Sequence, residues 1–407
     1  MTLNSRKLGF WAIWAIGVGT VVGDGVFLLI GEGISAAGPS SIIVYVIAGL
    51  IQMALMISLG ELAVGFPSGG AQSVWVEHFM GRHWGLVSGL AGSIGFLVLN
   101  GGLALALGTF TCYYFPSLNQ DVWTIIFALI YITIMIGLNI IGVGVAAKTQ
   151  LVLVMVLVAI MVVFGIVGIF SIDGSNFEPF SPNGMKGTLA ALPSGIYVYM
   201  GAVALCTAGD ECRNKVDLGR ALVWSSITFL VIYTLGMIVV VGTVPYEKIG
   251  LDVSPYALAG EVVFSKAGGI VLNSAAWIAT ATSILMGTIY VPSRMFSTMA
   301  EQGNMPQWLG RLNKKTGTPV NALIIIWIFS VLTIIASVVV EKVYVFVTNQ
   351  ATMLWIISWV LALIAGCLYR SRTLKGKDIK KELGWKQPLY PLCPIVGFVG
   401  CAYTMYV

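Results

Sequence analysis

Eleven apolar stretches follow one another along the 407-residue chain, separated by short polar connections. Each stretch is long enough to cross a bilayer as a helix, which takes about 20 mostly apolar residues. The pattern predicts an all-α membrane protein with about 11 transmembrane helices. The expected spans run approximately over 8–30, 41–65, 84–114, 122–144, 149–171, 188–209, 221–244, 268–292, 319–340, 343–369 and 389–407.

Composition agrees with a chain whose surface faces lipid. Hydrophobic residues make up 58% of the sequence and charged residues only 10%, so water is not the solvent for most of this surface. The lipid bilayer is therefore an expected partner. The net charge of +5 follows from the membrane topology described next, and no nucleic-acid partner is expected.

Basic residues lie mostly on one side of the predicted membrane. If the N-terminus is cytoplasmic, 18 of the 22 Lys and Arg residues fall in cytoplasmic segments, as the positive-inside rule requires. The outer side then holds Lys186, Lys248, Lys266 and Lys342. This asymmetry predicts a multi-pass protein of the cell membrane with a cytoplasmic N-terminus. The polar stretch 371–388 is then a basic cytoplasmic linker, expected to be solvated and to have no binding role.

Two of the stretches contain glycines where a spanning helix is normally most regular. The first reads Gly17-Val-Gly19-Thr-Val-Val22-Gly23-Asp24-Gly25, and the sixth contains Tyr197-Val198-Tyr199-Met-Gly201. Interrupted helices in matching positions of two halves indicate a transporter's binding site, because unwound turns free backbone N–H and C=O groups. The alternative for Gly19 and Gly23 alone is a close helix-packing face.

The number of predicted helices also predicts the domain organisation. Five helices in each half make the second half enter the membrane from the opposite side, which is the pattern of an inverted-topology repeat. The expected units are 1–173 and 174–370, and 371–407 holds the linker and one additional helix.

Asp24 and Glu61 are acidic residues inside the apolar stretches. A carboxylate at the bilayer centre costs about 2.5 to 3.5 kcal/mol on insertion scales, so each needs a partner or a function. Asp24, between two glycines, is expected to bind solute or to couple transport to protons. Glu61, near the inner end of the second helix, is a second coupling candidate. Its alternative is a structural carboxylate that bonds backbone groups of a broken helix.

Several motifs occur in a fixed order along nearly the whole chain. They are Val22-Gly-Asp-Gly-Val-Phe27, Gly60-Glu61-Leu62, Phe66-Pro67-Ser68-Gly69-Gly70, Tyr199-x-Gly201, Asp210-Glu211-x-Arg213-Asn214, and the segments 254–256, 293–306 and 318–321. With these motifs the chain resembles the amino acid, polyamine and organocation transporter superfamily. The resemblance implies two inverted five-helix repeats, with helices one and six broken around a central solute site.

The resemblance also implies which residues bind the solute. In relatives the backbone after the first break holds the solute's carboxylate, which maps here to Gly23, Asp24 and Gly25. Carbonyl groups of the sixth-helix break hold the amino group, which maps to Tyr197, Val198 and Gly201. Val22 and Tyr199 belong to the same two segments and are also candidates.

This sequence departs from the family pattern at three places. Relatives usually have a small or hydroxyl residue at the position of Asp24. Ala202 and Val203 stand where many relatives have an aromatic residue and then an acid. Leu157 stands where some relatives carry a lysine in helix five. The acid in helix six and the lysine in helix five that occur in relatives are therefore absent here. Asp24 instead adds a carboxylate that relatives usually lack.

Two mechanisms fit Asp24. In the first, the ionised carboxylate pairs with an amine that lacks a carboxylate of its own. In the second, burial keeps Asp24 protonated when an amino acid binds, and the proton travels with the solute. The expected function is therefore secondary transport of a small amino acid or related amine, coupled to protons or working by exchange.

The alternatives are a sodium-coupled symporter of the same fold and a non-transporting sensor or channel. Asn100 in the third helix either lines the site or ties helices together. Ser283, with Thr280 and Thr282, either lines the pocket or completes a sodium site. No arrangement typical of an enzyme is present, and neither a cofactor nor a metal site is expected.

Overall fold

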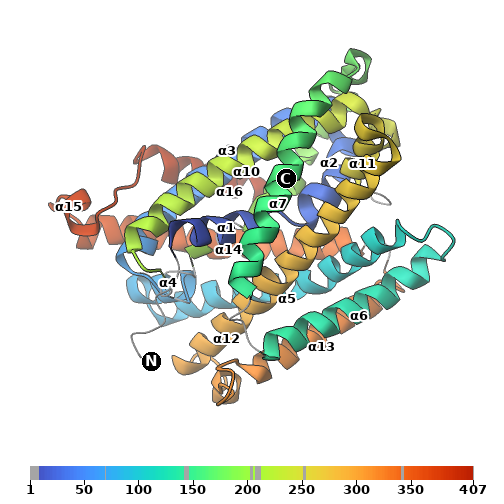
Figure 1. The fold of residues 1–407 in the computed structure, drawn as a ribbon. Helices are drawn as coiled ribbons and strands as arrows, with labels where there is room; N and C mark the ends of the chain where they lie inside the picture. The colour runs from blue at the N-terminus through green and yellow to red at the C-terminus, as the bar shows by residue number, and fades with distance from the viewer. Residues whose placement is uncertain are drawn as a thin grey trace.

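The computed structural model describes residues 9–68, 70–141, 146–201, 205–206, 212–250, 254–340 and 343–406, and this part of the chain contains helices and no β-strand (Figure 1). The α-helices are α1 (Phe10–Val21), α2 (Ile30–Ala37), α3 (Ser41–Gly65), α4 (Gln72–Met80), α5 (Arg82–Cys112), α6 (Gln120–Ile141), α7 (Ala146–Gly168), α8 (Gly184–Ala190), α9 (Leu192–Val198), α10 (Lys215–Thr243), α11 (Pro255–Thr282), α12 (Val291–Glu301), α13 (Val320–Ala336), α14 (Val343–Leu368), α15 (Ile379–Leu383) and α16 (Leu392–Tyr406). Three π-helical segments extend them, η1 (Gly25–Leu29), η7 (Ser283–Tyr290) and η9 (Tyr369–Thr373). Short 3-10 helices are η2 (Gly38–Ser40), η3 (Ile169–Ser171), η4 (Gly174–Phe177), η6 (Tyr246–Lys248) and η8 (Gln307–Gly310).

The helices confirm the predicted all-α membrane class. Seven helical segments are long and apolar enough to cross a bilayer, and α1, α13 and α16 are shorter apolar helices. The count of eleven spans stays a prediction, because only part of the expected sixth span, 188–209, lies within the described residues.

Two groups of helices pack around the centre of the molecule. Helix α10 packs against α1 and α3, while α5 packs against α6, α13 and α14. Close approach within the second group depends on small residues, as is usual between membrane helices. The Trp355 indole of α14 lies against Gly95 of α5 and donates a hydrogen bond to the Gly92 carbonyl at 3.1 Å. Helices α5 and α14 are thereby held firmly together.

The first helix is interrupted, as the sequence predicts. Helix α1 ends at Val21, Val22 has extended backbone angles, and helical structure resumes as the π-helix η1. An interruption frees carbonyl groups that lipid cannot satisfy. The Tyr233 hydroxyl of α10 donates to one of them, the Val21 carbonyl, at 3.0 Å. The break is thus supported by a polar contact from a neighbouring helix.

The second interruption follows α9. This helix spans only Leu192–Val198, and residues 199–201 continue as a tight turn. Ala202 and Val203, and also Asp210 and Glu211 of the predicted motif, lie outside the described residues. The inverted relation between the two halves remains a prediction.

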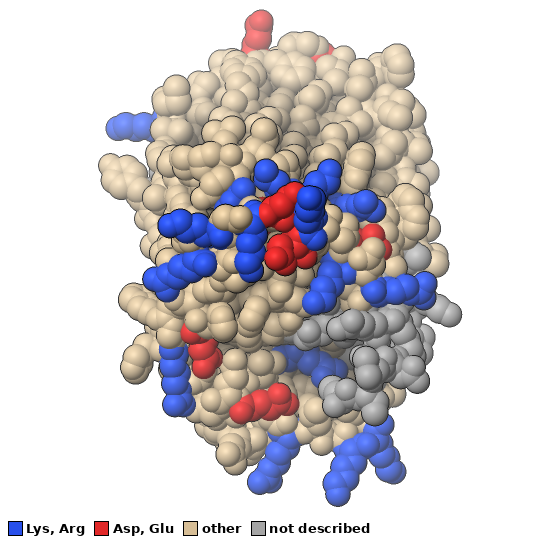
Figure 2. All heavy atoms as spheres, turned by 90° about the vertical axis from the view of Figure 1, so that its left-hand side faces the viewer, with Lys and Arg blue, Asp and Glu red and all other residues tan. Residues whose placement is uncertain are grey.

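Most residues of the basic linker are exposed, as expected of a solvated segment, but three of its residues pack onto the protein. Lys and Arg side chains gather on the end of the molecule where α15 lies (Figure 2). Leu374, Ile379 and Gln387 in this segment are nevertheless buried. Apolar side chains spaced between the lysines anchor the segment while the charges remain in water.

Candidate functional site

The Asp24 carboxylate lies at the interruption of the first helix and is only 4% exposed. Its Oδ2 atom accepts a hydrogen bond from the Tyr197 hydroxyl of α9 at 3.1 Å. The same oxygen accepts a second from the Tyr344 hydroxyl of α14 at 2.5 Å. Two phenol donors from distant parts of the chain therefore hold one buried carboxylate in place.

Glycines let the two interruptions approach each other. A Cβ atom at Gly201 would overlap the Thr20 carbonyl, and one at Gly25 would lie 3.0 Å from the Tyr197 ring. Any larger residue at these two positions would push the sixth-helix turn away from the first helix. The predicted pairing of the broken helices is thus present in the structure.

A small cavity lies where these segments meet. Its volume is about 30 Å³, which is room for one or two water molecules. The lining comes from α1 and η1, α5, the segment around α9, η7 and α14. The lining residues are Thr20, Val21, Gly23, Asp24, Gly25, Phe96, Leu99, Leu103, Tyr197, Val198, Met200, Gly201, Ser283, Gly287, Thr288 and Trp355.

Most of the predicted binding residues line this cavity. Gly23, Asp24 and Gly25 come from the first break, and Tyr197, Val198 and Gly201 come from the second. Ser283 also lines the cavity and lies next to the first break, since a Cβ atom at Gly23 would be 3.1 Å from its hydroxyl. The segments named from the sequence therefore meet at one place.

Val22, Asn100 and Tyr199 do not line it. Val22 is fully buried. Asn100 donates to Ser330 Oγ at 3.0 Å and accepts from Thr288 Oγ1 at 2.8 Å, so it ties α5 to α13 and η7 behind the cavity wall. The Tyr199 ring packs on Tyr233, with centroids 5.1 Å apart. The surroundings of these three residues fit helix packing better than solute binding.

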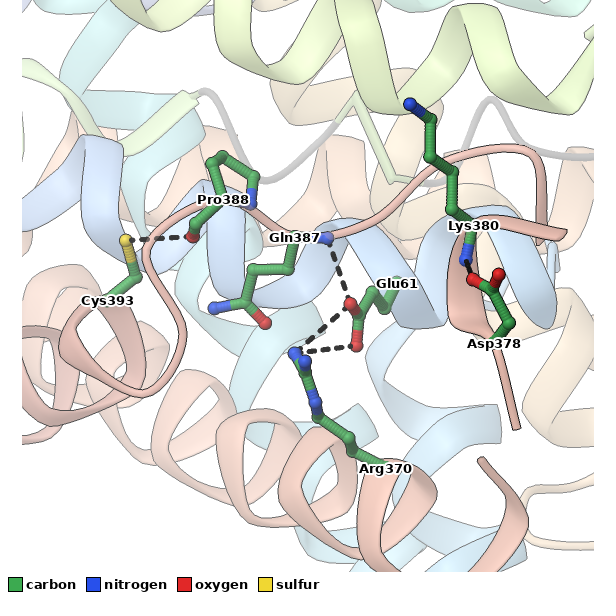
Figure 3. A network of polar contacts seen from close by, with 7 residues as sticks. All are labelled: Glu61, Arg370, Asp378, Lys380, Gln387, Pro388 and Cys393. Atoms are coloured by element: carbon green, nitrogen blue, oxygen red, sulfur yellow. Dashed lines mark hydrogen bonds and ion pairs between the residues drawn. The ribbon is translucent and has the colours of Figure 1, made fainter. Parts of the chain in front are cut away.

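Glu61 belongs to a separate network (Figure 3). Its two carboxylate oxygens accept from Arg370 Nη1 at 3.2 and 3.3 Å, and Oε1 also accepts from the Gln387 backbone N–H at 2.9 Å. The side chain is buried at the end of α3 and is not part of the cavity around Asp24. These contacts resemble the structural alternative, although the backbone donor comes from the linker.

Sequence reasoning missed several residues of the site, and four of them have polar or aromatic contacts that shape it. Tyr344 binds Asp24, Thr288 lines the cavity and bonds Asn100, and the rings of Phe96 and Trp355 form a wall with centroids 4.5 Å apart. Apolar helices carry many aromatic residues, so nothing in the sequence distinguishes these from packing residues. The available signal was the expectation that Asn100 or Ser283 lines the site, since Phe96 lies on the same helix as Asn100 and Thr288 on the same segment as Ser283.

The charge balance of the cavity limits what can bind there. Within the described part of the chain, its lining contains one acidic side chain and no Lys, Arg or His. Leu157, where some relatives place a lysine, is buried in α7. Among the described residues there is also no cluster of three His, Cys, Asp or Glu side chains that could hold a metal ion. A positive charge opposite Asp24 must therefore come from a bound solute or a proton.

Comparison with known proteins gives a consistent result. The family model described as amino acid permease matches residues 13–407. The chain is 26% identical to the amino-acid permease RocE of Bacillus subtilis, over 97% of this chain and 86% of that protein. It is 25% identical to the aromatic amino acid transport protein AroP of Escherichia coli K12, over 93% and 84%. It is 26% identical to the cationic amino acid transporter 1 of Arabidopsis thaliana, over 79% and 56%.

Proposed function

Because the chain belongs to the amino acid permease family, we propose that it carries a small amino acid or related amine across the cell membrane by alternating access. The observation that carries this proposal is the buried Asp24 carboxylate, which lines the central cavity without a basic residue opposite it. The solute's ammonium group is the partner that this carboxylate lacks.

The electrostatic argument begins with the cost of burial. A carboxylate taken out of water loses its hydration, and two neutral phenol donors replace only part of it. A bound ammonium ion adds a charge-assisted hydrogen bond, worth about 1.5 to 3 kcal/mol. Asp24 therefore favours solutes that carry a positive charge at this point of the site.

The two interruptions supply the other contacts. The N-terminus of a half-helix offers free N–H groups and the positive end of a dipole, which suits a carboxylate. Asp24 occupies this position and reduces the room for a second negative charge. An amino acid can therefore bind when Asp24 is protonated, whereas an amine without a carboxylate can bind the ionised form.

The cavity volume supports a mechanism with moving parts. A site of about 30 Å³ is far below the roughly 300 Å³ at which small-molecule pockets begin. Side chains such as Phe96 and Trp355 must separate before a solute enters. Alternating access provides this movement, because one group of helices rocks against the other around the central site.

We assign the coupling of transport to protons, or to exchange of solutes, to Asp24 as well. Asp24 is the one acidic side chain that the described residues contribute to the cavity lining, so a proton that travels with the solute has an acceptor there. The names of the relatives support an amino acid or a cationic amino acid as the transported class.

Uptake by the purified protein in liposomes tests the proposal. The Asp24→Asn variant keeps the shape of the side chain and removes its charge. If the ionised carboxylate pairs with an amine, we expect the variant to bind the transported solute about ten- to a hundredfold more weakly. If an amino acid binds with Asp24 protonated, the neutral Asn resembles that form and affinity should be kept. In both cases uptake should lose its response to pH. Asp121→Asn, at the exposed start of α6, is the matched control and should behave like the wild type.

Different gradients separate the alternatives. Uptake driven by an imposed proton gradient or by internal solute supports proton coupling or exchange, whereas dependence on sodium alone would favour the symporter alternative. Binding without any uptake would indicate a sensor. Unchanged affinity and unchanged pH response in Asp24→Asn would overturn the role assigned to this residue.

A further inference from the structure

The segment between α14 and α16 forms a strap across one end of the molecule. We use this name for residues 374–390, which include the short helix α15 at the far left of Figure 1. Trp385 of the strap fits against two glycines, Gly60 of α3 and Gly219 of α10, where a Cβ atom would collide with its ring. The strap therefore follows a defined path over the helix ends.

Polar contacts fix the strap at its second half. The backbone N–H of Gln387 donates to Glu61, which also accepts from Arg370 (Figure 3). The Arg370 guanidinium lies over the Tyr390 ring, 3.6 Å from its centroid, which is a favourable cation–π arrangement. Arg370 is thereby held between a carboxylate and an aromatic ring.

A second cavity opens between this strap and α10. Its volume is about 610 Å³, large enough for a headgroup-sized ligand. Basic side chains line it from three elements, Arg220 of α10, Arg370 of η9, and Lys380 and Lys386 of the strap. No acidic side chain is part of the lining among the residues that the structure describes. The cavity is therefore suited to an anion.

The basic lining is only partly neutralised from within. The ion pairs of the described residues join Arg220 to Asp217, Arg370 to Glu61, and Lys377 to Glu382. Neither Lys380 nor Lys386 takes part in them. The two lysines are therefore the lining residues whose charge is left for an anion.

The surface next to the cavity is apolar. Leu389 at the cavity edge is 67% exposed, and Leu392, Ile395 and Val399 continue along one face of α16 with more than half of each side chain exposed. Residues at these spacings lie on the same side of a helix. An exposed apolar face beside a basic cavity matches the two parts of a phospholipid, the acyl chains and the phosphate.

We propose that the cavity between the strap and α10 binds the headgroup of an anionic phospholipid. The phosphate lies among Lys380, Lys386 and Arg220, while the acyl chains lie along the exposed face of α16. The charge distribution predicts that this end of the protein is cytoplasmic, where anionic lipids attract juxtamembrane basic residues. Gathered Lys and Arg side chains on this face are visible in Figure 2.

Lipid binding to the purified full-length protein in detergent tests the proposal. The probes are phosphatidylglycerol, phosphatidylcholine and inorganic phosphate, with bound lipid counted by native mass spectrometry and thermal stability measured in parallel. We expect phosphatidylglycerol to bind and stabilise, and phosphatidylcholine to do neither. Removing both lysines in K380Q/K386Q should weaken phosphatidylglycerol binding about fivefold for each lysine.

The matched control is K314Q/K315Q, which removes two exposed lysines from the segment between α12 and α13. It should bind phosphatidylglycerol like the wild type. Equal binding of both lipids, equal loss in both double variants, or equal stabilisation by inorganic phosphate would overturn the lipid assignment. None of these measurements requires transport, so their outcome is independent of the proposed function.

Discussion

Asp24 is held by two phenol hydroxyls that approach its carboxylate from different helices. Tyr197 stands at the end of α9, and Tyr344 stands at the start of α14. Donors on both sides fix the direction of the carboxylate, which is what precise binding of an ammonium group needs. The position of one side chain in the first helix thus depends on two others far along the chain.

Replacing one phenol donor should weaken this arrangement. In Tyr344→Phe the ring remains and the hydrogen bond to Asp24 is lost, so we expect about tenfold weaker solute binding. Tyr199→Phe is the control, because the Tyr199 hydroxyl has no hydrogen-bond partner among the described residues. Thermal-shift titration with the transported solute measures both. Equal affinities for the two variants would contradict the positioning role of Tyr344.

The sequence predicts Asp24 but not Tyr344. A carboxylate between two glycines inside an apolar stretch is costly, so its presence alone indicates a function. A tyrosine in an apolar helix is common and carries no comparable cost. Its contact with Asp24 spans 320 residues, and only the folded structure, in which α14 packs against α5 and α9, reveals it.

Helix α5 lines the cavity, but its polar residue Asn100 faces away from it. It is apolar around most of its circumference, so its sequence does not indicate which side faces the cavity. Phe96, Leu99 and Leu103 line the cavity, whereas Asn100 points to α13 and η7. The sequence left open whether Asn100 lines the site or joins neighbouring helices. The rotation of α5 about its axis decides between the two.

Asn100→Leu tests the tie between these elements. The change leaves Ser330 and Thr288 without their partner, so we expect the free energy of unfolding to fall by about 1 to 3 kcal/mol. Solute affinity should stay within about twofold. Ser330→Ala completes a double-mutant cycle, and a coupling near zero would contradict the tie. Weaker solute binding with unchanged stability would instead indicate that Asn100 contacts the solute.

Helix positions were predictable where apolar length alone defines them. The expected span 41–65 coincides with α3 (Ser41–Gly65), and 343–369 nearly coincides with α14. The eighth expected span, 268–292, begins just after a break in α11, where Phe264 and Ser265 have non-helical backbone angles, and stops short of the observed end of α12 at Glu301. Helices can continue beyond the hydrocarbon core with polar residues, so an apolar window underestimates their length.

At the scale of the molecule, Glu61 joins the strap to the helix ends. Its partners Arg370 and Gln387 lie more than 300 residues further along the chain. No local pattern in the sequence indicates these partners, and the polar linker alone suggests a solvated loop. The fold therefore uses a segment rich in charge as a structural connection between α3, α10 and α14.

Glu61→Gln tests this connection. Its side chain is 4% exposed and that of Arg370 15%, so breaking the pair should lower the free energy of unfolding by about 2 kcal/mol. Glu382→Gln, in a pair whose side chains are about half exposed, should cost less than about 0.5 kcal/mol. Denaturation monitored in detergent measures both. If Glu61→Gln instead abolished proton-driven uptake without loss of stability, Glu61 would be a coupling residue after all.

The narrowness of the central cavity has a consequence for the resting membrane. A protein that held a wide aqueous passage between transport events would let ions run down the gradients on which the cell depends. Here Phe96, Trp355 and the paired helix interruptions leave space for about two water molecules beside Asp24, too few to form a continuous conducting file. The same side chains that a solute must displace therefore insulate the bilayer whenever transport is idle.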